Sequence, residues 1–150
     1  MKSWPTAFAL ALILLMVFIN GFPTGFPSAL QTQTPPGVQL NPASLNFGKQ
    51  VVRKPSVAKK ITVSNVGGTP LYINSATIAG DNWKDFTLLK DGCSGKQVAP
   101  GRSCLITVRF IPARIEDRNA TLTLTDNAPD SPQSISLKGT GINSIDVAPF

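Results

Sequence analysis

The clearest alternation of apolar and polar side chains lies in residues 98–112, which read VAPGRSCLITVRFIP. After the turn signal Pro100-Gly101, the apolar parity comprises Cys104, Ile106, Val108 and Phe110. The other parity carries Leu105, Thr107 and Arg109. A side-chain period of two predicts a β-strand with one buried face. Pro112 is expected to end this strand, because proline has no N–H to donate to a sheet.

Two more strands with the same period follow. Residues 118–126 read RNATLTLTD, and their core positions are expected to be Ala120, Leu122 and Leu124. Residues 133–141 read QSISLKGTG, and their core positions are expected to be Ile135 and Leu137. The segment NAPDSP between them is typical of a turn. Gly139 and Gly141 are interpreted as strand-end glycines.

The start of this region predicts shorter strand pieces. Residues 38–40 and 45–47 flank the bend signal Asn41-Pro42. A strand interrupted by such a bend often switches from one sheet of a sandwich to the other. Gly48 is expected to mark the turn that follows.

Residues 56–65 and 71–78 predict the next two strands. Their inward positions are expected to be Ile61 and Val63 in the first strand, and Leu71 and Ile73 in the second. Ile78 lies on the opposite parity from the inward positions before it. A bulge near Ser75 is therefore expected, because one extra residue reverses the phase of a strand.

Residues 80–90, GDNWKDFTLLK, are less regular. Trp83 and Phe86 are three positions apart, which allows a single helical turn, and a short strand over residues 86–89 is the alternative. Both aromatic residues are expected to be core or cap residues. A ligand-stacking role for Trp83 is the functional alternative.

These segments give about seven short strands at regular spacing and no convincing helix. The pattern predicts an all-β fold, a single seven-stranded antiparallel immunoglobulin-like β-sandwich over residues 38–141. A domain of this size buries a core large enough to fold alone. Residues 142–150 are expected to form a short tail.

The amino-terminal segment predicts export. Lys2 precedes the apolar run Ala7 to Ile19, which suits the core of a signal peptide and is short for a membrane span of about 20 residues. Residues 1–29 are interpreted as a signal peptide with Ala29 near the cleavage site, or as an uncleaved anchor that tethers the protein to a membrane. Residues 30–37 form a Pro-rich spacer. The expected location is secreted or in the cell envelope.

Cys93 and Cys104 are the only two cysteines in the chain. Export would place them where disulfides persist, so we expect a structural disulfide between them. A disulfide that closes so short a loop contributes about 3 kcal/mol in the chain-entropy model. A redox pair is the alternative, and it usually needs closer spacing and a helix amino terminus.

Charge and composition exclude several function classes. The chain has no histidine, which excludes Ser-His-Asp and Cys-His catalysis and every His-ligated metal site. The formal charge is +6, but the cations are scattered, with tight pairs only at Arg53-Lys54 and Lys59-Lys60. Nucleic-acid binding is not expected, because such proteins cluster cations and exposed aromatic residues.

A few polar residues could bind a ligand or carry a modification. Asp126, Asn127 and Asp130 share one turn and could offer oxygens to calcium, but such residues more often bond their own backbone. Asp81 and Asp85 flank Trp83 and could form an acid pair, but solvated loop carboxylates are the simpler interpretation. Asn119-Ala120-Thr121 matches a glycosylation sequon. We expect no cofactor and no metal.

An ordered series of segments resembles a known family. The segments are NPASLNFGKQ, KKITVSNVGGTPLYINSATIAG, the two cysteines around VAPGRSC, ITVRFIP and ATLTLTDNAPDSPQSISLKGTG. Together they are similar to the Hydin/ASH-type immunoglobulin-like domain, also found in bacterial choice-of-anchor D and VesB-like proteins. The resemblance covers residues 38–141, and it implies a seven-stranded sandwich related to the major-sperm-protein and PapD-like groups. Members are commonly tandem modules, whereas this chain has one copy.

The resemblance implies a function without catalysis and offers no catalytic residue to transfer. We expect an exported structural or protein-interaction module that binds another protein or a cell-envelope component by surface contact or edge-strand pairing. The alternative is a carbohydrate-binding or adhesion module of the envelope or extracellular matrix. Exposed aromatic residues on one sheet face would favour that alternative, and only Trp83 and Tyr72 are candidates.

Overall fold

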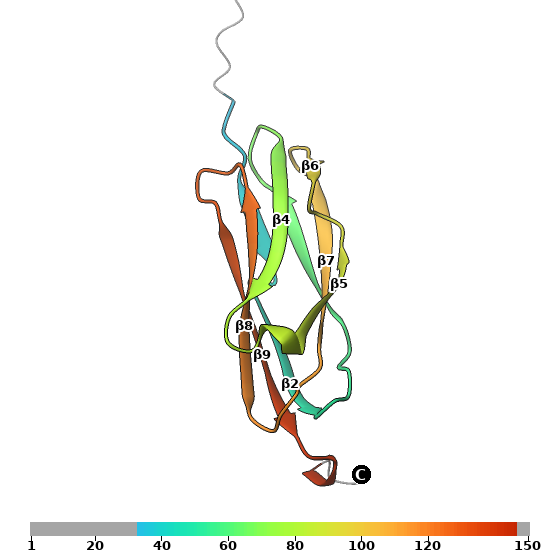
Figure 1. Cartoon of the computed structure of the whole chain (residues 1–150). Helices are drawn as coiled ribbons and strands as arrows, with labels where there is room; N and C mark the ends of the chain where they lie inside the picture. The colour runs from blue at the N-terminus through green and yellow to red at the C-terminus, as the bar shows by residue number, and fades with distance from the viewer. Residues whose placement is uncertain (1–32, 147–150) are drawn as a thin grey trace, which may run out of the picture. The chain divides into compact units, whose positions relative to one another are not determined.

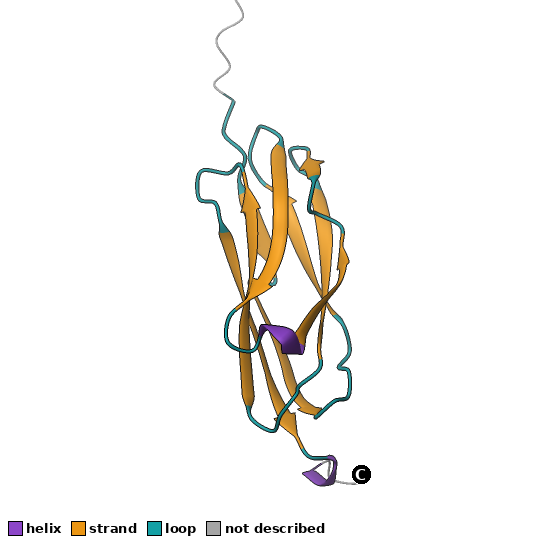
Figure 2. Ribbon diagram, viewed as in Figure 1, coloured by secondary structure: helices purple, strands orange, loops and turns teal. Residues whose placement is uncertain are grey.

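The computed structural model describes residues 33–146, which form two packed β-sheets (Figure 1). The strands are β1 (Val38–Asn41), β2 (Ser44–Val51), β3 (Lys59–Asn65), β4 (Leu71–Ala79), β5 (Phe86–Asp91), β6 (Lys96–Val98), β7 (Ser103–Phe110), β8 (Asp117–Asp126) and β9 (Gln133–Ile142). One sheet has the order β1-β3-β7-β5 and the other β2-β9-β8-β4-β6. Two short 3₁₀ helices also occur, η2 (Trp83–Asp85) and η3 (Ser144–Asp146) (Figure 2). The predicted all-β sandwich is confirmed.

The predicted seven antiparallel strands are wrong in number and in one pairing. The described residues contain nine strands. One addition arises at Asn41-Pro42, where the chain leaves the four-stranded sheet, in which β1 pairs with β3, and enters the five-stranded sheet, in which β2 pairs with β9. This change of sheet was expected from the sequence. The other addition is β6, which pairs with β4, and β2 runs parallel to β9.

The core lies between the two sheets at the parities that the sequence indicates. Buried positions on the five central strands are Ile61, Val63, Leu71, Ile73, Ile106, Val108, Phe110, Ala120, Leu122, Leu124, Ile135 and Leu137. Toward one end of the core, Phe47, Phe86 and Phe110 pack with ring centroids 4.9 to 5.9 Å apart. Burial of these faces is the main favourable term in folding the domain.

Two strands, β4 and β2, are irregular at positions for which the sequence predicted a bulge and a turn. The register of β4 against β8 shifts between Ile73 and Ser75, which confirms the bulge expected there. The turn expected at Gly48 is wrong. Gly48 lies inside β2 with a φ of 68°, and the register against β9 shifts between Asn46 and Lys49. A glycine in this left-handed conformation is a common device for a bulge within a strand.

The predicted disulfide is present between Cys93 and Cys104, whose Cα atoms are 5.3 Å apart. Cys93 is fully buried in the connection between β5 and β6, and Cys104 belongs to β7. The bond therefore ties the connection that leads to β6 onto a strand of the opposite sheet.

The amino-terminal predictions lie outside the described residues, including the apolar run Ala7 to Ile19 and the cleavage region near Ala29. The same holds for residues 147–150 of the predicted tail. Within residues 33–146, no helix has the length and hydropathy that a bilayer crossing needs.

Candidate interaction site

Trp83 is the largest aromatic side chain that the described structure leaves accessible, with 49% of its surface exposed. It opens η2, the turn that carries the chain from β4 of one sheet to β5 of the other (Figure 1). Both structures expected for this region occur, because β5 begins directly after the turn. Of the two aromatic residues expected to be core or cap residues, Phe86 is buried at 4% exposure. For Trp83 that expectation is wrong.

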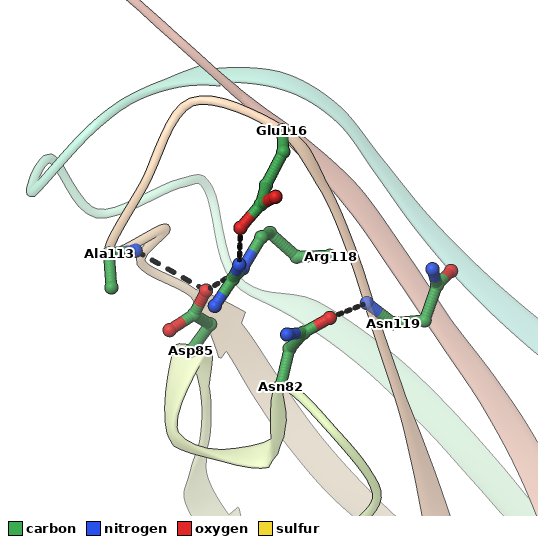
Figure 3. Close-up of polar contacts among 6 residues, drawn as sticks. All are labelled: Asn82, Asp85, Ala113, Glu116, Arg118 and Asn119. Atoms are coloured by element: carbon green, nitrogen blue, oxygen red, sulfur yellow. Dashed lines mark hydrogen bonds and ion pairs between the residues drawn. The ribbon is translucent and has the colours of Figure 1, made fainter.

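The turn is fixed on one side by a buried ion pair (Figure 3). Arg118 Nε donates to Asp85 Oδ2 at 2.5 Å, and the backbone N–H of Ala113 donates to the same oxygen at 3.3 Å. Arg118 also donates through Nη1 to Glu116. The side chains of Arg118 and Asp85 are only 11% and 4% exposed. A buried pair of this kind holds its elements together, because breaking it would leave one charge unpaired in the protein interior.

The turn is fixed on the other side by a reciprocal contact with β8 (Figure 3). Asn82 Oδ1 accepts from the backbone N–H of Asn119 at 2.8 Å, and the N–H of Asn82 donates to the Asn119 carbonyl at 3.2 Å. Trp83 thus lies between Asn82 and Asp85, both of which are anchored to β8. The indole of Trp83 is therefore carried by a turn that hydrogen bonds and an ion pair hold in place.

The interpretation of Asp81 and Asp85 as solvated loop carboxylates is wrong for Asp85, which is 3% exposed. Asp81 is exposed, so the two do not form an acid pair in a common buried site. The partner of Asp85 could have been inferred from the sequence. Arg118 shares the inward parity of Ala120 and Leu122, and an inward arginine requires a carboxylate partner.

Two hollows lie beside Trp83. They have volumes of about 610 and 390 Å³ and share Trp83 and Lys84 as lining residues. The larger hollow is polar and includes Asp81, Arg114, Glu116 and Arg118. The smaller hollow is mainly apolar and includes Ala76 and Ile78 of β4 and Phe86 and Leu88 of β5. We call both hollows together the Trp83 groove.

The residues that line the groove include three carboxylates and three cations. Asp85 and Glu116 both contact Arg118 and together with it carry one net negative charge. Lys84 and Arg114 have no carboxylate within ion-pair distance in the described part of the chain, and Lys84 Nζ lies 5.7 Å from the centre of the Trp83 ring. The groove therefore offers an aromatic surface, an apolar hollow, and two cations, Lys84 and Arg114, without an ion-pair partner among the described residues, while Asp81 in the polar hollow is a carboxylate without one.

The calcium candidates bond their own surroundings, as the alternative interpretation expected. Asp126 Oδ1 accepts from the backbone N–H of Ala128 at 2.8 Å, and Asn127 Oδ1 accepts from the N–H of Tyr72 at 2.7 Å. Burial raises the pKa of Asp126, and the nearby charge of Asp130 adds to this effect. Residues 33–146 contain no group of three or more His, Cys, Asp or Glu side chains placed to hold a metal ion.

The remaining candidates are separate from the groove. Tyr72 is also 49% exposed, but it lies at the start of β4, whereas Trp83 follows the end of that strand. Asn119 of the sequon is exposed on β8, and its backbone rather than its side chain makes the contacts with Asn82. The groove could not be predicted from the sequence, because it depends on how β4, η2 and β5 meet in space.

Comparison with solved structures places the fold among bacterial and human relatives. A protein of unknown function from Porphyromonas gingivalis W83 aligns at a TM-score of 0.58 and 21% identity, over 77% of this chain and 51% of that one. The Vibrio cholerae VesB protease aligns at 0.54 and 19% identity, over 69% of this chain and 31% of that one. This chain therefore spans about half of the first relative and about a third of the second. At these identities the likeness shows the fold alone.

A third relative is similar in size. The ASH/PapD-like domain 7 of human CEP192 aligns at a TM-score of 0.55 and 13% identity, over 83% of this chain and 99% of that domain. A sequence search of curated proteins finds no match. The model of the HYDIN/CFA65/VesB-like, Ig-like domain family matches residues 36–140. This chain therefore belongs to the HYDIN/CFA65/VesB-like Ig-like domain family.

Proposed function

We propose that this chain is an exported, non-catalytic module that binds a protein partner through the Trp83 groove. The observation that carries the proposal is the half-exposed Trp83 on a turn anchored at Asn82 and Asp85. Tryptophan contributes strongly to interfaces because it buries a large apolar area with few rotatable bonds. A fixed support adds to this contribution, since little side-chain and loop freedom is lost on binding.

The non-catalytic part of the proposal rests on the family and on the chemistry of the groove. General acid–base and nucleophilic catalysis need a group with a free proton site or an activated nucleophile. The buried carboxylate of the groove, Asp85, accepts from Arg118 and Ala113 instead. The groove thus has the character of a binding surface.

The export part of the proposal rests on two features. The apolar run Ala7 to Ile19 suits a signal peptide or an amino-terminal anchor. The Cys93–Cys104 disulfide belongs to the kind of bond that persists in oxidising compartments.

Intact mass and fractionation in the native host test the export part of the proposal. Loss of roughly the first 20 to 30 residues from a soluble protein supports secretion, full length in the membrane fraction supports a tether, and full length in the cytosol contradicts export.

Affinity capture from the native host tests the binding function. The full chain, its Trp83→Ala variant and its Tyr72→Ala variant are used side by side. Tyr72 is the matched control, because it is an equally exposed aromatic residue elsewhere on the domain. A partner whose recovery falls with Trp83→Ala and not with Tyr72→Ala supports the proposal. Equal recovery with all three proteins contradicts it.

The carbohydrate-binding alternative receives less support from the structure. Aromatic platforms for sugars need exposed rings that line up along one binding surface. Tyr72 lies at the start of β4 and Trp83 follows the end of that strand, so they do not form such a row.

A further inference from the structure

We propose that the Trp83 groove binds an extended peptide segment as an added strand on the free edge of β4, with an acidic residue of that segment at Lys84. This inference rests on the proposed function, because it uses the same groove and specifies the kind of partner. Three observations carry it, namely the pairing of β4, the protection of the other sheet edges, and the lining of the apolar hollow.

The pairing of β4 leaves one of its edges open. Along one edge, β4 pairs with β8 from Ile73 to Ala79. Along the other edge, β6 pairs only with Leu71, Tyr72 and Ile73. In the described structure, residues 75–79 have no ladder partner on that second edge. A row of backbone N–H and C=O groups without a strand partner is a template for another strand.

The other outer strands carry features that hinder strand addition. On β2, the bulge at Gly48 interrupts the strand, and Lys59 Nζ donates to the Asn46 carbonyl at 2.6 Å. On β5, the register against β7 shifts between Leu88 and Lys90. β1 has only four residues and is followed by Pro42. Bulges, lysines, prolines and short length are devices by which proteins block their sheet edges. On β4 the bulge precedes Ser75, and residues 75–79 contain no lysine and no proline.

The apolar hollow lies where side chains of an added strand would enter. Ala76 and Ile78, on alternate positions of β4, line it together with Leu88 of β5. Because side chains alternate along a strand, every second residue of an added segment would continue the row of Ala76 and Ile78 into this hollow. Trp83 lines the same hollow and would cover the inserted side chains.

The charged residue in the apolar hollow indicates which charge the bound segment should carry. Lys84 is the only charged residue that lines the apolar hollow, and it has no carboxylate partner within the described residues. The polar hollow beside it carries both signs of charge, with Arg114 and with Asp81, which is unpaired in the described structure, among its lining residues, so it does not select for either sign. A carboxylate of the bound segment at Lys84 gains a charge-assisted contact, whereas a lysine there is repelled. The expected segment therefore alternates apolar residues and carries an Asp or Glu at the Trp83 end.

Peptide selection on the intact protein tests this inference. A phage-displayed library of random dodecapeptides is selected on the full-length, disulfide-bonded chain, and the enriched peptides are synthesised for calorimetry. The expected peptides carry apolar residues two positions apart and an acidic residue beyond them. Their Kd should rise by tenfold or more, about 1.4 kcal/mol, with Trp83→Ala and with Lys84→Glu. It should not change with Tyr72→Ala. Urea unfolding of each variant verifies that the domain remains folded.

Backbone methylation separates strand addition from ordinary groove binding. N-methylation of alternate peptide residues should weaken binding about tenfold, because each removes one inter-strand hydrogen bond, and the intervening positions should tolerate it. Binding that depends on Trp83 but tolerates methylation everywhere overturns strand addition and leaves the groove function intact. A library that yields no peptide dependent on Trp83 overturns the inference itself. A dimer in sedimentation that Lys84→Glu dissociates overturns it as well, since the edge would then belong to a second copy.

Discussion

Asp85 and Arg118, separated by 33 positions in the sequence, form the ion pair that joins η2 to β8. Both side chains are almost completely buried, and the carboxylate also accepts from the backbone of Ala113. The pair lies beside the point where the chain turns from the surface to the core. Directly after Asp85, Phe86 packs inside the sandwich, whereas Trp83, two positions before Asp85, remains at the surface.

Replacing Asp85 should destabilise the whole domain. Asp85→Asn removes the buried carboxylate that Arg118 contacts and leaves only the exposed carboxylate of Glu116, so we expect the free energy of unfolding to fall by about 3 kcal/mol. Urea denaturation followed by circular dichroism measures this loss. The matched control is Asp81→Asn, which lies on the exposed side of the same turn and should change stability by less than about 0.5 kcal/mol. Equal effects of the two substitutions would show that the ion pair is not structural.

Gly139 is expected to tolerate no side chain. A Cβ atom at this position would lie 2.5 to 2.8 Å from three ring atoms of Phe110, which is itself fully buried. Gly139→Ala should therefore cost about 1 to 3 kcal/mol through overpacking. Ser136→Ala in the same strand is the control, because Ser136 points to solvent. A Gly139→Ala variant with wild-type stability would mean that the Phe110 ring moves without cost.

The disulfide is expected to stabilise the folded state measurably. Replacing both Cys93 and Cys104 by alanine should lower the free energy of unfolding by about 3 kcal/mol, because the unfolded chain loses its short covalent loop. Dithiothreitol should destabilise the wild-type protein to a similar extent and should leave the double variant unchanged. Reductant sensitivity that persists in the double variant would contradict this explanation.

Asp126 and Asp91 should contribute to pH dependence with opposite signs. Burial raises the pKa of Asp126 above its ordinary 3.8, so its ionised form costs stability at neutral pH and this cost disappears as the pH falls through the raised pKa. For Asp91, burial also raises the pKa, but hydrogen bonds from Ser94 and Cys93 and the charge of Lys96 outweigh it and lower the pKa overall. Its stabilising contribution is present above 3.8 and is lost as the pH falls through the lowered pKa.

Two neutral variants test these signs. At pH 7, Asp126→Asn should be more stable than the wild type and Asp91→Asn less stable, and both differences should shrink as urea unfolding is repeated toward about pH 3. The amide oxygen of asparagine can still accept the backbone hydrogen bonds that each carboxylate accepts, so the charge is the main change. Differences that stay constant over this range would exclude titration of these groups as the cause.

Much of the sandwich could be predicted from the sequence, because its central strands alternate strictly. Ile106, Val108 and Phe110 lie on one parity of β7, and Ala120, Leu122 and Leu124 lie on one parity of β8. All six are buried as expected. The change of sheet at Asn41-Pro42 was also predictable, since proline interrupts a ladder.

Other features depend on contacts between distant segments and could not be predicted from local pattern. β6 has three residues, and only its pairing with β4 makes it a strand. Trp83 and Phe86 are both large aromatic residues, and the contacts of Asn82 and Asp85 with β8 decide which one is exposed. The Trp83 groove depends on these same contacts. The sequence therefore indicated Trp83 as a possible ligand-stacking residue, but it could not show the groove that Trp83 lines.

Photo-crosslinking in the native host tests the central claim most directly. The full chain is expressed there with p-benzoylphenylalanine in place of Trp83 or, in a second strain, in place of Tyr72. If the Trp83 groove is the binding surface, irradiation will give a discrete protein adduct from position 83 and none of that mass from position 72. The same adduct from both positions, or no adduct from position 83, would contradict the assignment of this groove as the site where the module meets its partner.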